Sequence, residues 1–289
     1  DLSPAPLMFI NHPSRTATGL GVWGEVSPEE LRGWHAAAPN VLVGMEGAPG
    51  HQAIRTERGL YRNEDAATLG GYDQMTAQVG GVWDQLLADG MHFWITANSD
   101  SHVNRRDGGR DYDPGEYSKT YAWARPDAGD ILDALRYGRI FTVTGDLIDA
   151  LELRVAGGDV SGTLGDSLTL SVTQTMQVEV RVRQPTRANA NGQLPALKRI
   201  ELIVGGREDD GTLKMQRRGF DAATWSRERD WIVARWSLPV PSRGGFVRVR
   251  GNSTGAVDPS PDERGEDPWN DLWFYSNPVF VNVADTARR

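Results

Sequence analysis

The chain has 289 residues, of which 39% are hydrophobic and 24% charged, a composition typical of a globular protein that buries one large core or two ordinary ones. Its net charge of −8 at pH 7 argues against non-specific binding to nucleic acid or anionic membranes, and no apolar run approaches the roughly 20 residues of a membrane span. Because the chain contains no cysteine, disulfides, thiolate nucleophiles and cysteine-based zinc sites are excluded.

The first half of the sequence alternates between strand-like and helix-like patterns. Short apolar runs at residues 7–11, 41–46, 91–97 and 140–144 are typical of buried strands. Helices are predicted at 28–38, where Ser27 is a good N-cap and Pro28 suits the first turn, and at 73–88 and 127–137, where apolar residues recur with a period of 3.6. This alternation favours a parallel sheet or barrel.

From about residue 149 the pattern changes to a period of two. Val178, Val180 and Val182 alternate with charged residues, and similar alternation occurs at 151–155, 199–204, 231–236, 246–250 and 279–283. Clusters of glycine, proline and aspartate separate these runs, and we expect residues 258–267 to form a mobile acidic loop. The second half therefore predicts an antiparallel β-sandwich, which divides the chain into domains at 1–147 and 148–289.

Two of the predicted strands end in residues with metal-ligand chemistry. The third strand leads into Asn98, Asp100 and His102, and the first ends at His12. A carboxylate and imidazoles at neighbouring strand ends suit a borderline divalent cation. The sequence thus predicts a metal site with His12, Asp100 and His102 as ligands, and Asp100 is also a candidate acceptor for the proton of a reacting water.

Further candidates surround this predicted site. Glu46 ends the second strand and is either a metal ligand or a residue that orients one. Arg15 is a candidate catalytic residue, because its guanidinium suits an anionic group such as a phosphate; a surface salt bridge is the alternative. Candidate substrate contacts are His51, Asn98, Arg105 and Lys119. The other two histidines, His35 and His92, are expected to be structural.

Several segments together resemble the PHP (polymerase and histidinol phosphatase) superfamily, in particular its bacterial carbaryl-hydrolase-like group with a C-terminal β-sandwich. The matching segments are Asn11-His12-Pro13-Ser14-Arg15, Glu46-Gly47-Ala48-Pro49-Gly50-His51, Asn98-Ser99-Asp100-Ser101-His102, residues 130–139 and Tyr275-Ser276-Asn277-Pro278-Val279. The resemblance implies a fold of the α/β plus all-β class, in which the C-terminal part of a distorted β/α barrel is followed by the sandwich. It also implies bound zinc, manganese or iron.

The chain departs from that family pattern in one respect. The pattern begins with a His-x-His strand end, and no His-x-His occurs among the five histidines here. We therefore expect the chain to be the C-terminal part of a longer enzyme, or to be completed by a separate N-terminal barrel fragment or by another copy in a homo-oligomer. Relatives with a sandwich are often exported, which favours a periplasmic or secreted location.

The expected function is hydrolysis of a small phosphoester or related ester by a metal-activated water. The chain has no G-x-S-x-G elbow and no P-loop ending in Gly-Lys-Ser/Thr, so a serine esterase or nucleotide-binding mechanism has little support. The alternative is a non-catalytic binding or scaffold protein, with a degenerate metal site and tryptophans of the sandwich in contact with sugar or a partner.

Overall fold

The computed structural model describes residues 6–50, 60–61, 67–101 and 111–284. Strands dominate it: 39% of residues lie in strands and 13% in helices. Three sheets are present in the described ranges, with eight, five and three strands. None of the helices in these ranges is long and apolar enough to cross a membrane.

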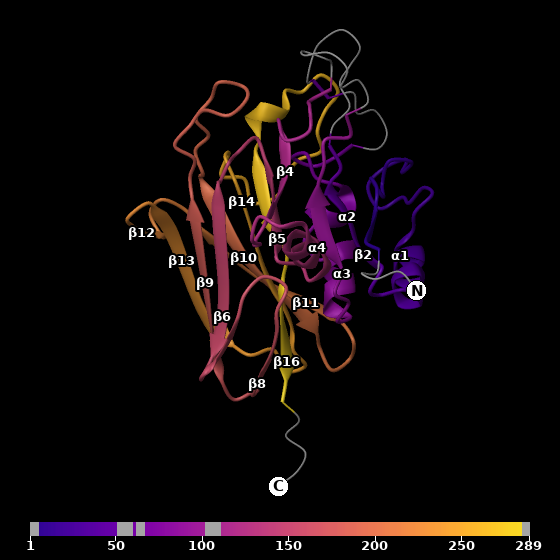
Figure 1. Ribbon diagram of the computed structural model, residues 1–289. Coiled ribbons are helices and arrows are strands. Elements are labelled where there is room, and N and C mark those ends of the chain that lie inside the picture. The colour runs from indigo at the N-terminus through magenta and orange to yellow at the C-terminus, as the bar shows by residue number, and fades with distance from the viewer. Residues whose placement is uncertain (1–5, 51–59, 62–66, 102–110, 285–289) are drawn as a thin grey trace.

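The largest sheet forms the middle of the molecule (Figure 1). Its main path has the order β11-β10-β14-β15-β5-β4, and β16 pairs with both β14 and β8. The bounds are β4 (Ser118–Ala122), β5 (Ile140–Thr144), β8 (Ser167–Leu170), β10 (Arg199–Arg207), β11 (Leu213–Phe220), β14 (Gly245–Asn252), β15 (Trp273–Ser276) and β16 (Val279–Val283).

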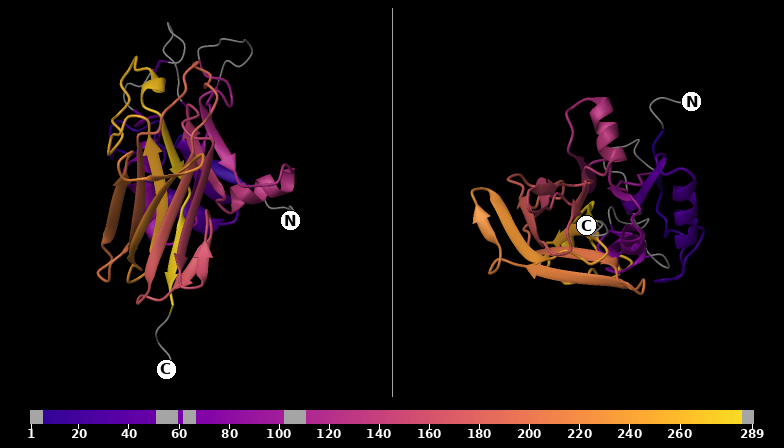
Figure 2. Two further views of the ribbon diagram at one scale, coloured as in Figure 1. Left: turned by 90° about the vertical axis from the view of Figure 1, so that its left-hand side faces the viewer. Right: turned by 90° about the horizontal axis from the view of Figure 1, so that it is seen from below.

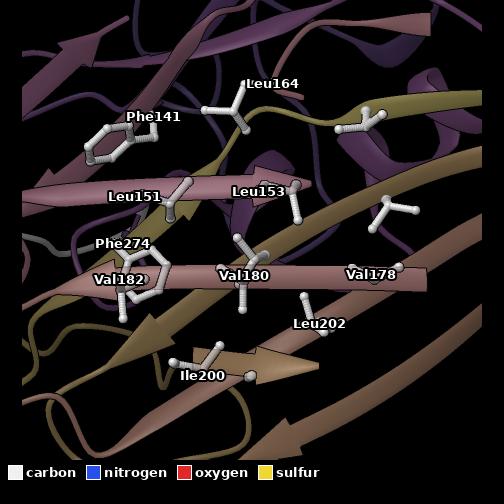
Figure 3. Close-up of a cluster of buried hydrophobic side chains, with 14 of the residues drawn as sticks. Phe141, Leu151, Leu153, Leu164, Val178, Val180, Val182, Ile200, Leu202 and Phe274 are labelled. Carbon is white, nitrogen blue, oxygen red and sulfur yellow. The ribbon is translucent and has the colours of Figure 1, made fainter. Parts of the chain in front are cut away.

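A five-stranded sheet packs on one face of this central sheet. Its order is β12-β13-β9-β6-β7, with bounds β6 (Ala150–Gly157), β7 (Val160–Gly162), β9 (Thr175–Arg183), β12 (Ser226–Glu228) and β13 (Trp231–Pro239). The alternation along β9 places Val178, Val180 and Val182 inside, where they meet Leu202 of β10 and Phe274 of β15 in one core (Figure 3). The period-two strands predicted in this half are therefore present, and they pair antiparallel except that β16, antiparallel to β14, runs parallel to β8.

The opposite face of the central sheet carries a second core. The three-stranded parallel sheet β1-β2-β3 lies on this side, with bounds β1 (Met8–Ile10), β2 (Leu42–Ala48) and β3 (Trp94–Ala97). Helices α1 (Pro28–Ala37), α2 (Gln74–Ala77) and α3 (Val82–Ala88) accompany it. Phe246 and Tyr275 of the central sheet pack with Trp83 of α3 in this core. The inner strands of the central sheet, β5, β14 and β15, are thus buried on both faces.

A buried ion pair also joins α3 to the central sheet. Arg248 Nε and Nη2 lie 2.7 and 2.8 Å from the two carboxylate oxygens of Asp84, and both side chains are fully buried. The guanidinium carbon of Arg248 lies 5.0 Å from the ring centroid of Trp83. Either charge alone would be buried without water to solvate it. Loss of one partner would therefore destabilise the fold by leaving the other charge unpaired.

Two side chains form hydrogen bonds with the backbone N–H and C=O groups on the edge of β3 that faces the central sheet. Asn277 accepts a hydrogen bond from Ile95 N (2.9 Å) and donates one to Ile95 O (3.0 Å), as a neighbouring strand would. Thr120 does the same for Ala97, accepting from its N–H at 2.8 Å and donating to its carbonyl at 3.0 Å. The parallel sheet is therefore attached to the central sheet through side chains.

The prediction of a β/α barrel followed by a sandwich is wrong. The parallel sheet is open and stops at three strands, and the fourth predicted barrel strand, β5, pairs antiparallel with β4 and β15 instead. The physical reason is that β5 is buried on both faces, so its apolar run looks the same in a parallel or an antiparallel sheet. The boundary near residue 147 stays a prediction.

The predicted helices are present, with one difference. Ser27 and Glu30 form a capping box at the start of α1, and α4 (Ala128–Arg136) matches the helix predicted at 127–137. The helix predicted at 73–88 is divided into α2 and α3, because Gly80 has a φ of 77° and Gly81 is extended. A short 3₁₀ helix, Pro268–Asn270, precedes β15.

Candidate functional site

The candidate site lies where the three parallel strands end. Parallel strands present their carboxyl ends at one edge, so residues that follow β1, β2 and β3 come close together. His12 follows β1, Glu46 lies in β2, and Asp100 follows β3. The structure therefore places these three predicted site residues at one edge of the parallel sheet, but their ligand atoms do not all lie within 4.8 Å of one another.

Hydrogen bonds join these strand ends directly. The backbone N–H of His12 donates to Glu46 Oε2 at 2.6 Å, and the Asn98 amide donates to Glu46 Oε1 at 2.7 Å. Arg15 Nη2 lies 2.8 Å from Asp100 Oδ2. Glu46 thus fixes the position of His12 and of Asn98, whereas Asp100 is held by Arg15.

The backbone at two of these positions adopts an unusual conformation. His12 has a φ of 29° and Asp100 a φ of 50°, and both are in the left-handed region that favours glycine. Such a conformation costs on the order of 1–3 kcal/mol at a non-glycine residue and is concentrated at functional sites. It turns the chain sharply at each strand end, directly at the two best metal-ligand candidates.

A buried aspartate supports the segment that carries Arg15. Asp73 accepts hydrogen bonds from Ser14 N (2.9 Å), from Ser14 Oγ (2.7 Å) and from Met75 N (2.9 Å). Burial raises the pKa of Asp73, and these hydrogen bonds oppose the increase. The carboxylate therefore anchors the 12–15 turn to the start of α2. We infer that it positions Arg15 without itself reaching the candidate site.

The electrostatics of the site favour an added positive charge. Burial raises the pKa of Glu46, the bonds from His12 and Asn98 lower it, and the neighbouring Asp100 raises it again. The Arg15 guanidinium pairs with Asp100, and the charge of His12 also lowers the pKa of Glu46. A cationic ligand or proton would be stabilised between Glu46 and Asp100.

The remaining predicted site residues lie elsewhere or outside the description. Lys119 forms an ion pair with Asp146 and alternates along β4 with Thr120, which faces β3, so the Lys119 side chain points away from the strand ends. His51, His102 and Arg105 lie outside the described residues. Their predicted roles stay predictions.

The two histidines expected to be structural have structural contacts. His35 is buried, its Nδ1 lies 2.8 Å from Leu42 O, and it packs edge-on against Phe93. His92 stacks on Phe280 with ring centroids 4.4 Å apart. His92 precedes β3 and lies beyond the opposite end of that strand from Asp100.

An acidic cluster is present that the sequence interpretation missed. Asp262, Glu266 and Asp271 place carboxylate oxygens within 4.8 Å of one another, and they are the one compact group of three potential metal ligands in the described ranges. Burial raises the pKa of Asp262 to about 6, and burial together with the other two carboxylates raises the pKa of Asp271 to about 8.

Hydrogen bonds within the chain already occupy part of this acidic cluster. Asp262 accepts hydrogen bonds from Thr68 Oγ1 (2.5 Å), Gly70 N (2.8 Å) and Gly71 N (2.9 Å), so both of its oxygens are engaged. The segment expected to be a mobile acidic loop is thus fastened to residues 68–71 by a buried carboxylate. The signal available in the sequence was the dense acidic spacing, but burial of Asp262 could not be deduced from it.

Comparison with known proteins does not identify the chain. No family model matches the sequence, and no curated protein matches it. The function must therefore be argued from the strand-end site itself.

Proposed function

We propose that the chain is a metal-dependent hydrolase of phosphoesters or related esters, acting at the ends of β1, β2 and β3. The observation that carries the proposal is the pair of left-handed strand ends, His12 and Asp100, which follow the two outer strands of one three-stranded parallel sheet, with Glu46 on β2 between them. Non-glycine residues held in such a strained backbone conformation are concentrated at active sites and ligand-binding sites. The motif resemblance to the PHP superfamily supports the same chemistry.

The donor types at the site fit a divalent cation such as zinc, manganese or iron. His12 offers an imidazole and Asp100 a carboxylate, and Glu46 adds a buried carboxylate whose pKa is raised. In the described structure both Glu46 oxygens accept hydrogen bonds from His12 N and Asn98, so Glu46 suits the role of orienting His12. A cation bound there would supply a Lewis acid and lower the pKa of a coordinated water.

Arg15 and Asp100 are the residues that would act on the substrate. The Arg15 side chain is 30% exposed, so a substrate oxygen can reach its guanidinium. We assign to Arg15 the binding of a phosphoryl or carbonyl oxygen, on which negative charge develops during attack by water. Asp100, once Arg15 turns to the substrate, accepts the proton of that water.

The proposal is tested by turnover of chromogenic substrates. We expect hydrolysis of p-nitrophenyl phosphate, bis(p-nitrophenyl) phosphate or p-nitrophenyl acetate that depends on added Mn²⁺, Zn²⁺ or Fe²⁺. Asp100→Asn should lower kcat about 100-fold, the order of magnitude for loss of one electrostatic contribution to catalysis. Arg15→Gln should mainly raise KM for the phosphate substrates.

Matched controls are available on the far sheet. Asp159→Asn, in the exposed turn between β6 and β7, and Arg227→Gln, exposed on β12, remove the same charges elsewhere. Both should leave turnover unchanged. Turnover that survives Asp100→Asn, or that no metal stimulates, would contradict the proposal and favour the non-catalytic binding or scaffold protein.

A further inference from the structure

A groove lies beside the segments that flank helix α4 and is lined by Trp123 before the helix and by residues 136, 137 and 139 at and after its end. It consists of two adjoining cavities of about 480 and 490 Å³, which share Arg139 and Asp166 as lining residues. We call this the α4 groove. Each cavity has the size of an ordinary small-molecule site. Figure 2 shows α4, coloured magenta to pink, standing out from the body of the protein. Arg136 at the end of α4 and Tyr137 after it line the second cavity.

An exposed tryptophan lines the first cavity. Trp123, which follows β4, is 47% exposed, and its indole Nε1 donates to Leu151 O at 2.9 Å. Its backbone N–H donates to Arg139 O at 2.9 Å. The ring is therefore held in place by β6 while nearly half of its surface stays open, which makes it a preorganised platform for stacking.

An exposed aromatic residue also lines the second cavity. Tyr137, directly after α4, is 55% exposed and lines this cavity. His92 lies in the same cavity, and burial lowers its pKa, so its ring is neutral at pH 7. The two cavities thus present one exposed aromatic side chain each, on either side of Arg139 and Asp166.

The charges in the first cavity cancel. Arg139 and Arg154 line it together with Glu152 and Asp166, and hydroxyls of Ser161 and Thr163 add further polar contacts. Arg139 is also paired with Asp130 at 3.0 Å, and in the second cavity Arg136 donates to Asn40 O at 2.6 Å. The guanidinium and carboxylate groups of the first cavity therefore do not favour an anion or a cation. They do suit neighbouring hydroxyl groups, which donate to the carboxylates and accept from the guanidinium groups.

We propose that the α4 groove binds a neutral oligosaccharide, with one sugar ring stacked on Trp123 and a neighbouring ring on Tyr137. The apolar C–H face of a sugar covers each aromatic ring, while its hydroxyls pair with Arg139, Arg154 and Asp166. This binding site does not depend on the proposed hydrolase activity, because none of its residues belongs to the strand-end site.

The test starts from the intact chain on an array of neutral glucose-, mannose-, galactose-, xylose- and N-acetylglucosamine-containing oligosaccharides. Titration calorimetry with the bound sugar then compares variants. We expect Trp123→Ala to weaken binding at least tenfold and Trp123→Phe to retain most of it. Tyr137→Ala should weaken binding of longer sugars more than that of monosaccharides. Arg154→Gln, at an exposed position, should weaken binding without affecting the fold.

Two control variants make the result specific. Trp34→Ala removes a tryptophan that is 41% exposed on α1, outside the groove, and Asp100→Asn disables the proposed hydrolase site. Both should bind the sugar as the parent chain does. The proposal is overturned if no neutral sugar binds, if only anionic sugars or peptides bind, or if Trp123→Ala and Arg154→Gln bind like the parent.

Discussion

Replacing Asn277 tests how the parallel sheet is joined to the rest of the protein. The Asn277 side chain is fully buried and takes the place of a fourth strand beside Ile95. In Asn277→Ala, Ile95 N–H and Ile95 C=O both lose their partner inside the protein. The carbonyl of Ile140 keeps a bond from the Asn277 backbone N–H at 3.3 Å, so it is not left alone.

The size of the effect follows from the two unsatisfied backbone groups. Each buried group that loses its partner costs about 1–3 kcal/mol. Entry of water into the small cavity would move the sum towards the lower end, so we expect the free energy of unfolding to fall by about 3 kcal/mol. Asn277→Asp should be nearly as damaging at pH 7, because a buried carboxylate cannot donate to Ile95 O, and should improve as the pH falls and the carboxyl group becomes a donor.

Urea denaturation followed by tryptophan fluorescence measures this change. Asn191→Ala is the matched control, since Asn191 is exposed and a surface substitution changes stability by about 0.5 kcal/mol or less. If Asn277→Ala loses less than about 1 kcal/mol relative to that control, the side-chain bridge does not join the two sheets in the way we describe.

Three further perturbations have defined outcomes. Because the pKa of Asp271 is raised to about 8 in the folded protein, the free energy of unfolding should fall as the pH rises from 4 to 8, by less than about 1.4 kcal/mol per pH unit for this partly buried group. Urea midpoints at several pH values should show a weaker fall in Asp271→Asn, and equal slopes would contradict this. Arg248→Met leaves Asp84 buried and unpaired and should cost about 3–5 kcal/mol, whereas combining it with Asp84→Leu should recover part of that loss in a double-mutant cycle; simple additivity would show that the two charges do not interact. Ser27→Ala should cost about 1 kcal/mol by removing the α1 cap, measured by thermal unfolding.

Local signals predicted much of the secondary structure. Ser27, Pro28 and Glu30 specify the start of α1 through side-chain and backbone chemistry that is contained within four residues. The break between α2 and α3 was also present in the sequence as Gly80-Gly81, but the apolar period on both sides concealed it.

Pairing between distant strands could not be predicted in the same way. β5 pairs with β15, and Phe141 lies opposite Ser276. Nothing near residue 141 indicates that partner, because an apolar strand buried on both faces fits either a parallel or an antiparallel neighbour. The barrel was inferred from the parallel alternative, and this non-local choice is where the prediction failed.

Part of the candidate site was predictable, because some of its residues lie directly after strands that the sequence indicates. His12 and Asp100 stand out because each follows a strand with few intervening residues. Their placement at one edge of the sheet depends only on β1 and β3 running parallel on either side of β2. The support from Asp73 to Ser14 connects residues 59 positions apart and had no signal in the pattern. The Lys119 prediction relied on sequence proximity alone, and its side chain lies on the other face of β4.

The measurement that tests the central claim most directly is isothermal titration calorimetry, in which Mn²⁺ or Zn²⁺ is titrated into the metal-free intact chain. We predict stoichiometric binding that is lost in Asp100→Asn and weakened in His12→Ala, and that is unchanged in Asp159→Asn. Binding that persists in Asp100→Asn and His12→Ala but is lost in Asp262→Asn would place the cation in the acidic cluster, and would contradict the assignment of the strand ends as the hydrolase site.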